Sequence, residues 1–121
     1  MAQSYHEPTD QLSNEAMELH RGINSLIEEL EAVNWYNQRA DVTADEELKA
    51  TVLHNRDEEI EHAVMLFEWL RRRLPEVDEE MRTYLFTEMP ITAVEEAAEG
   101  EGGEGEDADG GDGSLGIGPG R

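Results

Sequence analysis

Apolar residues recur at intervals of three or four along the first third of the chain, from residue 12 to about residue 41. This spacing places them on one face of an amphipathic helix, because an α-helix turns by about 100° per residue. The residues of this face are Leu12, Ala16, Leu19, Ile23, Leu26, Leu30 and Val33. The pattern predicts a first long helix over residues 12–41.

A second long helix is predicted to begin just after the first. Thr43 and Glu46 have the spacing of a capping box, in which two side chains bond backbone N–H groups at the start of a helix. Pro75 ends this helix, because proline lacks an N–H and clashes with the preceding turn. The apolar face consists of Leu48, Val52, Ala63, Leu66 and Leu70.

The C-terminal third is predicted to hold one short helix and a tail. The helix covers residues 76–88 and ends before Met89–Pro90; its apolar side consists of Val77, Met81, Tyr84 and Leu85. Residues 97–121 contain seven acidic residues and ten of the eleven glycines, a composition that cannot build a core. We therefore assign the helical domain to residues 1–96 and a disordered acidic, glycine-rich linker to residues 97–113.

The two long helices predict an all-α fold built on an antiparallel two-helix hairpin with a short third helix. Each long helix has about 30 residues and is roughly 45 Å long. A hairpin of this kind buries little and leaves an apolar groove exposed. Pairing with a second copy covers the groove and produces a four-helix bundle, so we expect an obligate homo-oligomer.

The formal net charge of -21, from 9 basic and 30 acidic residues, narrows the range of partners. Nucleic acid is an unfavourable partner, because its binding depends on Lys and Arg neutralising phosphates. An anionic membrane surface is unfavourable for the same reason, whereas multivalent cations are concentrated near such a protein. The longest apolar run, Ala63–Phe67, is far shorter than the roughly 18 residues that a membrane-spanning helix needs.

The residues present also restrict the chemistry and the location. With no cysteine, the chain has no disulfide, thiolate metal site or thiol nucleophile. The first ten residues lack the basic stretch and hydrophobic core of a secretory signal. We expect a cytoplasmic protein.

One of the four histidines has a glutamate three residues before it, in the sequence Glu59-Ile60-Glu61-His62. Helical periodicity places Glu59 in the apolar stripe and His62 at its side, while Glu58 and Glu61 rotate toward solvent. Burying Glu59 unpaired would cost several kcal/mol, and no Lys or Arg shares its stripe, so a metal ion fits the position. The structural alternative is a neutral, hydrogen-bonded Glu59–His62 pair at an oligomer interface.

A further acidic ligand is expected from the first helix, where Glu29 flanks the apolar face while Glu28 and Glu31 lean away. Counted from a turn near residue 42, Glu29 lies 13 residues back, whereas Glu59 and His62 lie 17 and 20 forward. This is an axial mismatch of roughly 6–10 Å, so one hairpin does not obviously close the site. A two-fold partner would give two copies of each ligand around a dinuclear centre, as in bundle-core di-iron proteins.

Carboxylate oxygens with one imidazole per metal suit Fe(II), and Mn(II), Co(II), Zn(II) or Ca(II) are expected substitutes. Four carboxylates balance the charge of two divalent ions, so assembly should depend on metal.

Three segments of the chain resemble the encapsulated ferritins: ELEAVNWYNQRAD (29–41), HNRDEEIEHA (54–63) and RTYLFTE (82–88). The resemblance implies a ferritin-like four-helix bundle made by two hairpins, a ferroxidase centre between them, and a ring-shaped decamer of five dimers. It implies that Glu29, Glu59 and His62 of both subunits are the iron ligands.

The resemblance also implies roles around the centre. Trp35 and Tyr36 would lie beside it, with Tyr36 seven residues after Glu29 on the same stripe, and Glu28 and Glu31 would form an outer metal-entrance site. Ordinary interface packing is the alternative for the two aromatic residues. Asn34 and Asn37 depart from the more acidic character expected there, which would slow iron capture. His54 has no assigned role and is expected at the surface or an interface.

The terminal Ser114–Gly118, SLGIG, resembles the peptides by which cargo proteins dock on the inner wall of an encapsulin shell, within the docking segment 114–121. Residues 97–113 would span about 20–25 Å as a flexible coil. The predicted function is a ferroxidase that oxidises Fe(II) with O₂ for iron storage inside an encapsulin nanocompartment. The alternatives are a non-catalytic metal-stapled scaffold or cargo assembly, and a di-iron peroxidase or oxygenase.

Overall fold

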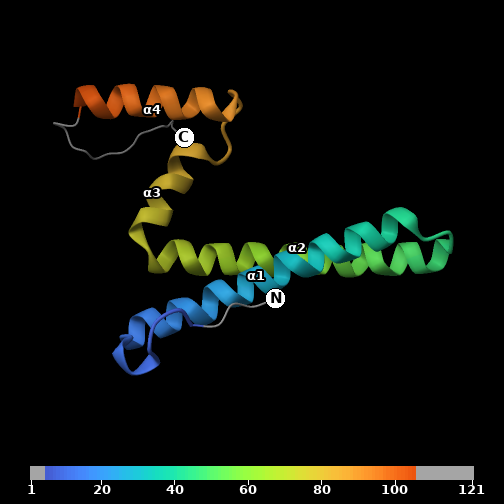
Figure 1. Cartoon of the computed structure of the whole chain (residues 1–121). Coiled ribbons are helices and arrows are strands. Elements are labelled where there is room, and N and C mark those ends of the chain that lie inside the picture. Colours follow the sequence, from blue (N-terminus) through green and yellow to red (C-terminus); the bar gives the residue numbers. More distant parts are fainter. Residues whose placement is uncertain (1–4, 106–121) are drawn as a thin grey trace. The chain divides into compact units, whose positions relative to one another are not determined.

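The computed structural model describes residues 5–105, which form helices joined by short connections and contain no strand. A short 3-10 helix, Thr9–Gln11, is followed by four α-helices (Figure 1). Their bounds are α1, Asn14–Val42; α2, Glu46–Arg73; α3, Pro75–Tyr84; and α4, Ile91–Gly105. The chain divides into two compact units, with the boundary after Leu70. The predicted all-α class is confirmed, and the architecture is consistent with a ferritin-like helical fold.

Helix α1 matches the predicted first helix to within two residues at each end. Ser13 caps it, because its side-chain oxygen accepts a hydrogen bond from the Ala16 N–H at 3.0 Å, and Glu15 in the first turn favours the positive end of the helix dipole. The helix ends where the Thr43 N–H bonds the Arg39 carbonyl.

Helix α2 begins three residues after Thr43, and its cap is Asp45. The Asp45 carboxylate accepts from the N–H groups of Glu47 and Leu48, both at 3.0 Å, whereas the Thr43 hydroxyl accepts from the Asp45 N–H. The predicted Thr43–Glu46 capping box is therefore wrong. A carboxylate directly before the helix satisfies the same N–H groups and also interacts favourably with the helix dipole.

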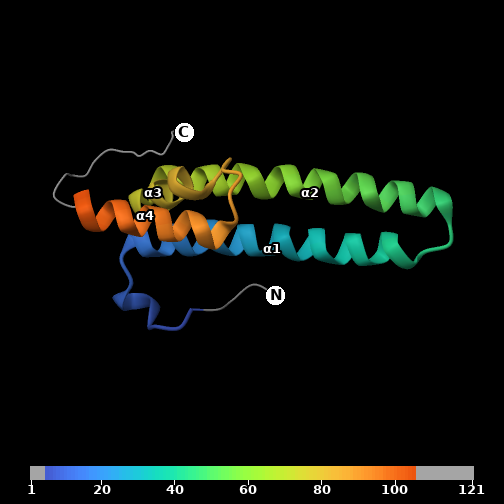
Figure 2. The same cartoon turned by 90° about the horizontal axis from the view of Figure 1, so that it is seen from above.

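Helices α1 and α2 form an antiparallel hairpin, in which they lie side by side and cross (Figures 1 and 2). Its buried residues are few: Leu26 and Ala40 from α1, Val52 and Ala63 from α2. Large apolar side chains remain exposed on both helices, among them Ile23, Leu30, Trp35, Leu48, Ile60, Val64 and Met65. A hairpin with this much uncovered apolar surface is typical of a protein that associates.

Helices α1 and α2 approach each other closely at Gly22. A Cβ atom added at Gly22 would lie 2.2 Å from Cζ3 of the Trp69 ring. Glycine is needed here because any larger residue would overlap the indole ring.

The second unit differs from its prediction in two places. Helix α3 ends at Tyr84, four residues early, because Leu85 is extended and Phe86 takes a positive φ of 63°, which an α-helix cannot accommodate. Helix α4 was not expected. It packs against α3, buries Val94, and its Ala and Glu residues are good helix formers.

Helix α4 also covers residues 97–105, the first part of the segment assigned to a structureless linker. The remainder of that segment and the docking segment 114–121 lie outside the described residues, and the domain division stays a prediction. Within residues 5–105, no helix combines the length and apolar character needed to span a membrane.

Candidate metal centre

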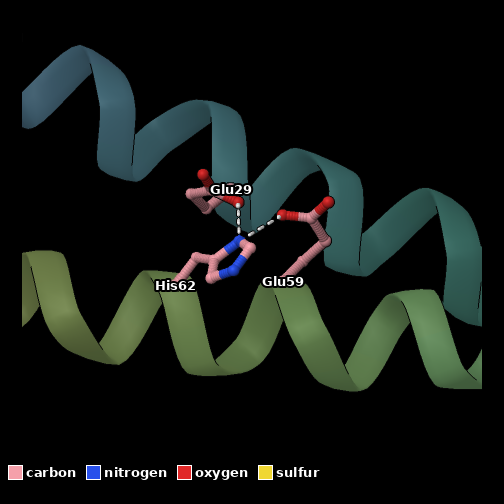
Figure 3. Close-up of side chains that lie close together, drawn as sticks. All are labelled: Glu29, Glu59 and His62. Carbon is pink, nitrogen blue, oxygen red and sulfur yellow. Dashed lines mark hydrogen bonds and ion pairs between the residues drawn. The ribbon is translucent and has the colours of Figure 1, made fainter.

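Glu29, Glu59 and His62 meet between the two helices of the hairpin (Figure 3). Glu29 projects from α1, and Glu59 and His62 project from successive turns of α2. The His62 Nδ1 atom lies 3.3 Å from Glu59 Oε1 and 3.7 Å from Glu29 Oε1. One donor atom from each side chain lies within 4.8 Å of the others, and this is the only such group of three among the residues that the structure describes.

All three side chains come from one chain, so the expected axial mismatch is wrong. The connection between the helices is residues 43–45, which moves the centre of the turn from residue 42 to Ala44. Counted from Ala44, Glu29 lies 15 residues back and Glu59 lies 15 forward. Two residues of error in the turn change the calculated offset by about 6 Å, because each residue counts once on each helix.

The donor atoms have separations that suit a single cation. Oxygen and nitrogen ligands lie about 2.0–2.2 Å from a first-row divalent ion, so two donors of one ion are at most about 4.4 Å apart. The two distances from His62 Nδ1, 3.3 and 3.7 Å, fall within this limit. Two carboxylates and one imidazole are also the donor types that bind Fe(II), Mn(II), Co(II) and Zn(II).

The site is half-buried and electrostatically strained. The side chains of Glu29, Glu59 and His62 are 27%, 26% and 45% exposed, so Glu59 is less deeply buried than its place in the apolar stripe predicts. Hydrogen bonding with Glu59 raises the pKa of Glu29, and desolvation and the negative charges of Glu59 and Glu28 add to this, against the opposing effect of His62. A bound cation would relieve this repulsion between carboxylates.

The other residues singled out in the sequence lie outside this cluster of donor atoms. Glu28 is exposed and acts on Glu29 through its charge, while Glu31 is partly buried. Trp35 is 48% exposed, and the Arg39 guanidinium lies 5.6 Å from the centre of the Tyr36 ring. The roles of these four acidic and aromatic residues stay predictions.

His54 lies at the surface, one of the two places expected for it. Its side chain is 71% exposed, and its Nε2 atom is 3.8 Å from Glu58.

Both asparagines that depart from the expected acidity have hydrogen-bond partners. Asn34 accepts from Gln38 within α1 at 3.0 Å. Asn37 accepts from Arg56 of α2 at 2.8 Å, which joins the two helices close to the cluster. Arg56 is a residue that sequence reasoning missed, and its partner 19 positions away leaves no local signal.

The fold and the cluster define a class of protein: helical hairpins that gather two glutamates and a histidine at the donor distances of a metal ion. The EncFtn-like family model matches residues 4–88, so the chain belongs to the EncFtn-like family. It is 56% identical to an encapsulated ferritin-like protein of Rhodospirillum rubrum, over 95% of this chain and 86% of that protein.

Two further proteins are similar to this chain. The chain is 54% identical to a ferritin-like protein of Thermotoga maritima, over 83% of this chain and 88% of the relative. The crystal structure of protein ne0167 from Nitrosomonas europaea superposes with a TM-score of 0.71 at 57% identity, over 74% of this chain and 98% of that one.

Proposed function

We propose that the protein is a ferroxidase, in which two hairpins pair so that Glu29, Glu59 and His62 of each enclose two Fe(II) ions that O₂ oxidises to Fe(III). The observation that carries this proposal is the meeting of two carboxylates and an imidazole at metal-donor distances within one hairpin. Membership of a family whose relatives are named ferritin-like supports iron as the metal.

Pairing of two copies completes the centre. One hairpin supplies three donor atoms and two negative charges, whereas two hairpins supply four carboxylates, which balance two divalent ions. Leu30 and Ile60 directly follow Glu29 and Glu59 in the chain, and both are exposed. Covering such apolar side chains favours association around the acidic cluster. The family resemblance extends this to a ring-shaped decamer of five dimers.

The reaction requires only that electrons leave the iron and protons reach oxygen. Two Fe(II) ions each give one electron to O₂, which takes up two protons, so that the products are two Fe(III) ions and H₂O₂. The charge on the centre rises by two, and the carboxylates of Glu29 and Glu59 stabilise this increase electrostatically. The His62 imidazole supplies a neutral nitrogen donor to each ion.

The surrounding residues are assigned supporting roles. Glu28 and Glu31 attract Fe(II) toward the centre as an outer entrance site, with Trp35 near it. Tyr36 donates a hydrogen bond close to the metals. The exposure of Glu28 and its charge effect on Glu29 support its part in this assignment.

An encapsulin shell is the proposed partner, and its interior the proposed location. The relative from Rhodospirillum rubrum is named an encapsulated ferritin-like protein, and Ser114–Gly118 has the sequence SLGIG expected of a docking peptide. The Fe(III) produced would pass into the shell for mineral storage. A ring of hairpins encloses no cavity of its own, so the protein without its shell should store little iron.

Mixing anaerobic, Fe(II)-loaded protein with O₂ and following Fe(III) absorbance tests the activity. Glu29→Ala, Glu59→Ala and His62→Ala should each remove most of the oxidation. Glu58→Ala is the matched control, because Glu58 is exposed and adjacent but lies outside the cluster, and it should oxidise like the wild type. A wild-type rate in Glu59→Ala would refute the ligand assignment.

Two further results identify the alternatives, the first from the same experiment and the second from an assay with added H₂O₂. If metal stays bound and oxidation does not exceed the rate in buffer, the protein is a metal-stapled scaffold. If H₂O₂ is consumed with an organic reductant faster than O₂ is, the centre is a peroxidase.

A further inference from the structure

A side-chain hydrogen bond joins α1 to α2 one helical turn from Glu59. Arg56 Nη1 donates to Asn37 Oδ1 at 2.8 Å, while Arg56 Nε and Nη2 donate to Asp57 Oδ1 at 3.2 and 3.0 Å. Asp57 thus orients the planar guanidinium and directs its remaining edge at α1. The Arg56 side chain is 29% exposed, whereas Asn37 is exposed, so the bond lies at the surface of the hairpin.

Helix geometry explains why these two side chains meet. The Cα–Cβ bonds of a helix tilt toward its N-terminus, so Arg56 leans toward the turn of the hairpin and Asn37 leans away from it. Counted from Ala44, Asn37 lies 7 residues back and Arg56 lies 12 forward. The axial separation is therefore about 7.5 Å, and the two side chains converge across it.

We propose that the Arg56–Asn37 bridge is a positioning device, which fixes the sliding position of α1 against α2 so that Glu29 meets Glu59 and His62. The inference rests on the proposed function, because it concerns the affinity of the centre for metal. Metal–ligand distances tolerate errors of about 0.2 Å, whereas a slide of one residue along a helix moves a side chain by about 1.5 Å. A small loss of alignment would therefore separate Glu29 from the other two ligands.

The bridge adds a directional contact to a centre whose other nearby contacts are apolar or repulsive. The carboxylates of Glu29 and Glu59 repel each other before a cation binds. The buried side chains near them, Leu26, Ala40, Val52 and Ala63, are all apolar, and apolar contacts have no preferred direction. A hydrogen bond at 2.8 Å is directional and holds one alignment.

The test measures binding of Co(II) alone to the full-length protein under anaerobic conditions, for the wild type and three variants. Asn37→Leu removes the bridge without changing charge. Gln38→Leu is the matched control, because it removes the neighbouring amide, whose bond to Asn34 stays within α1. Asn37→Asp keeps an oxygen that can accept from Arg56.

Asn37→Leu should lower the affinity for Co(II) about tenfold, the lower end of the loss that follows when groups orienting metal ligands are removed, and should change the visible absorption of the bound ion. Gln38→Leu should keep the affinity and the spectrum of the wild type. Asn37→Asp should keep the spectrum and bind Co(II) at least as tightly, because its added negative charge attracts the cation. The spectrum reports the geometry around the ion, which a mere loss of stability would not alter.

Arg56→Met separates the effect of position on cation affinity from the effect of charge, because the two act in opposite directions. Removing a positive charge near a cation site raises cation affinity by electrostatics alone, so a fall in affinity would come from the lost position of the ligands. If Asn37→Leu does not fold, Arg56→Lys replaces it, because lysine keeps the charge but cannot reproduce the planar fork. It too should bind Co(II) more weakly than the wild type.

The inference would be overturned if Asn37→Leu kept the affinity and spectrum of the wild type, or if Asn37→Leu and Gln38→Leu lost affinity equally. A wild-type protein that fails to bind Co(II) would overturn the proposed centre itself. This result is distinct from Co(II) binding that is the same with and without the bridge.

Discussion

Replacing Gly22 by alanine tests the close approach of α1 and α2 on which the metal cluster depends. The added Cβ would lie 2.2, 2.6 and 2.8 Å from three ring carbons of Trp69, whereas carbon atoms in contact are normally about 3.5–4.0 Å apart. The helices must separate by more than about 1 Å at this point, or the indole must turn out of its place. Gly22 is only two turns from Glu29, so either movement would also disturb the ligands.

Two opposing effects set the expected change in the free energy of unfolding. Alanine is better than glycine inside a helix by about 0.8–1.0 kcal/mol. Forcing extra volume into a tight contact typically costs about 1–3 kcal/mol. The cost exceeds the gain, and we expect a net loss of about 1 kcal/mol, which would lower the melting temperature by about 4–8 °C for a domain of this size.

Thermal unfolding followed by circular dichroism, at one protein concentration, measures the change. Gly100→Ala is the control, because a Cβ at Gly100 meets nothing within 4 Å, and it should be neutral or stabilising. In a Trp69→Leu background the penalty of Gly22→Ala should shrink, since the overlapping ring is absent. If Gly22→Ala is as stabilising as Gly100→Ala, the helices do not pack as the structure has them.

Three further predictions concern pH and encapsulation. Hydrogen bonds from Arg82 and Arg71 hold the pKa of Asp78 below its usual range. The resulting stability is complete above the ordinary pKa of an aspartate and is lost as the pH falls through the lowered one, so thermal stability between about pH 5 and pH 2 should fall less steeply in Asp78→Asn. The raised pKa of Glu29 has the opposite effect on stability: the metal-free protein loses stability as the pH rises through this pKa. Metal-free Glu29→Gln should therefore melt at a higher temperature than the wild type at pH 7, and Co(II) should reverse the order; an unchanged order contradicts the electrostatic account. Deleting residues 114–121 should leave Fe(II) oxidation intact and abolish co-purification with an encapsulin shell, and retained encapsulation would refute the docking role.

The long helices were predictable because their apolar positions repeat with the helical period, and α1 begins and ends within two residues of its expected bounds. Helix α4 carries no such signal, since Val94 is its one buried residue among those described, and apart from Ile91 and Thr92 the rest is alanine, glutamate and glycine. The end of α3 depends on the positive φ of Phe86, a conformation that a bulky residue rarely takes and that no glycine or asparagine marks here.

The candidate ligands were predictable to different degrees. Glu59 and His62 share a helix, so their spacing alone brings them together. Whether Glu29 lies level with them depends on the position of the turn between the helices. An error of two residues in that position makes ligands that meet appear separated along the helix axes. The bridge from Arg56 to Asn37 is set by the tilt of side chains on two antiparallel helices, which a pattern along one helix does not contain.

The most direct test of the central claim is a crystal structure of the protein loaded with Fe(II) under anaerobic conditions, with anomalous diffraction recorded at the iron edge. The account predicts two iron peaks related by a two-fold axis between two hairpins, each within bonding distance of Glu29, Glu59 and His62. Iron bound away from these three side chains, or hairpins joined through another surface with the two clusters far apart, would contradict it.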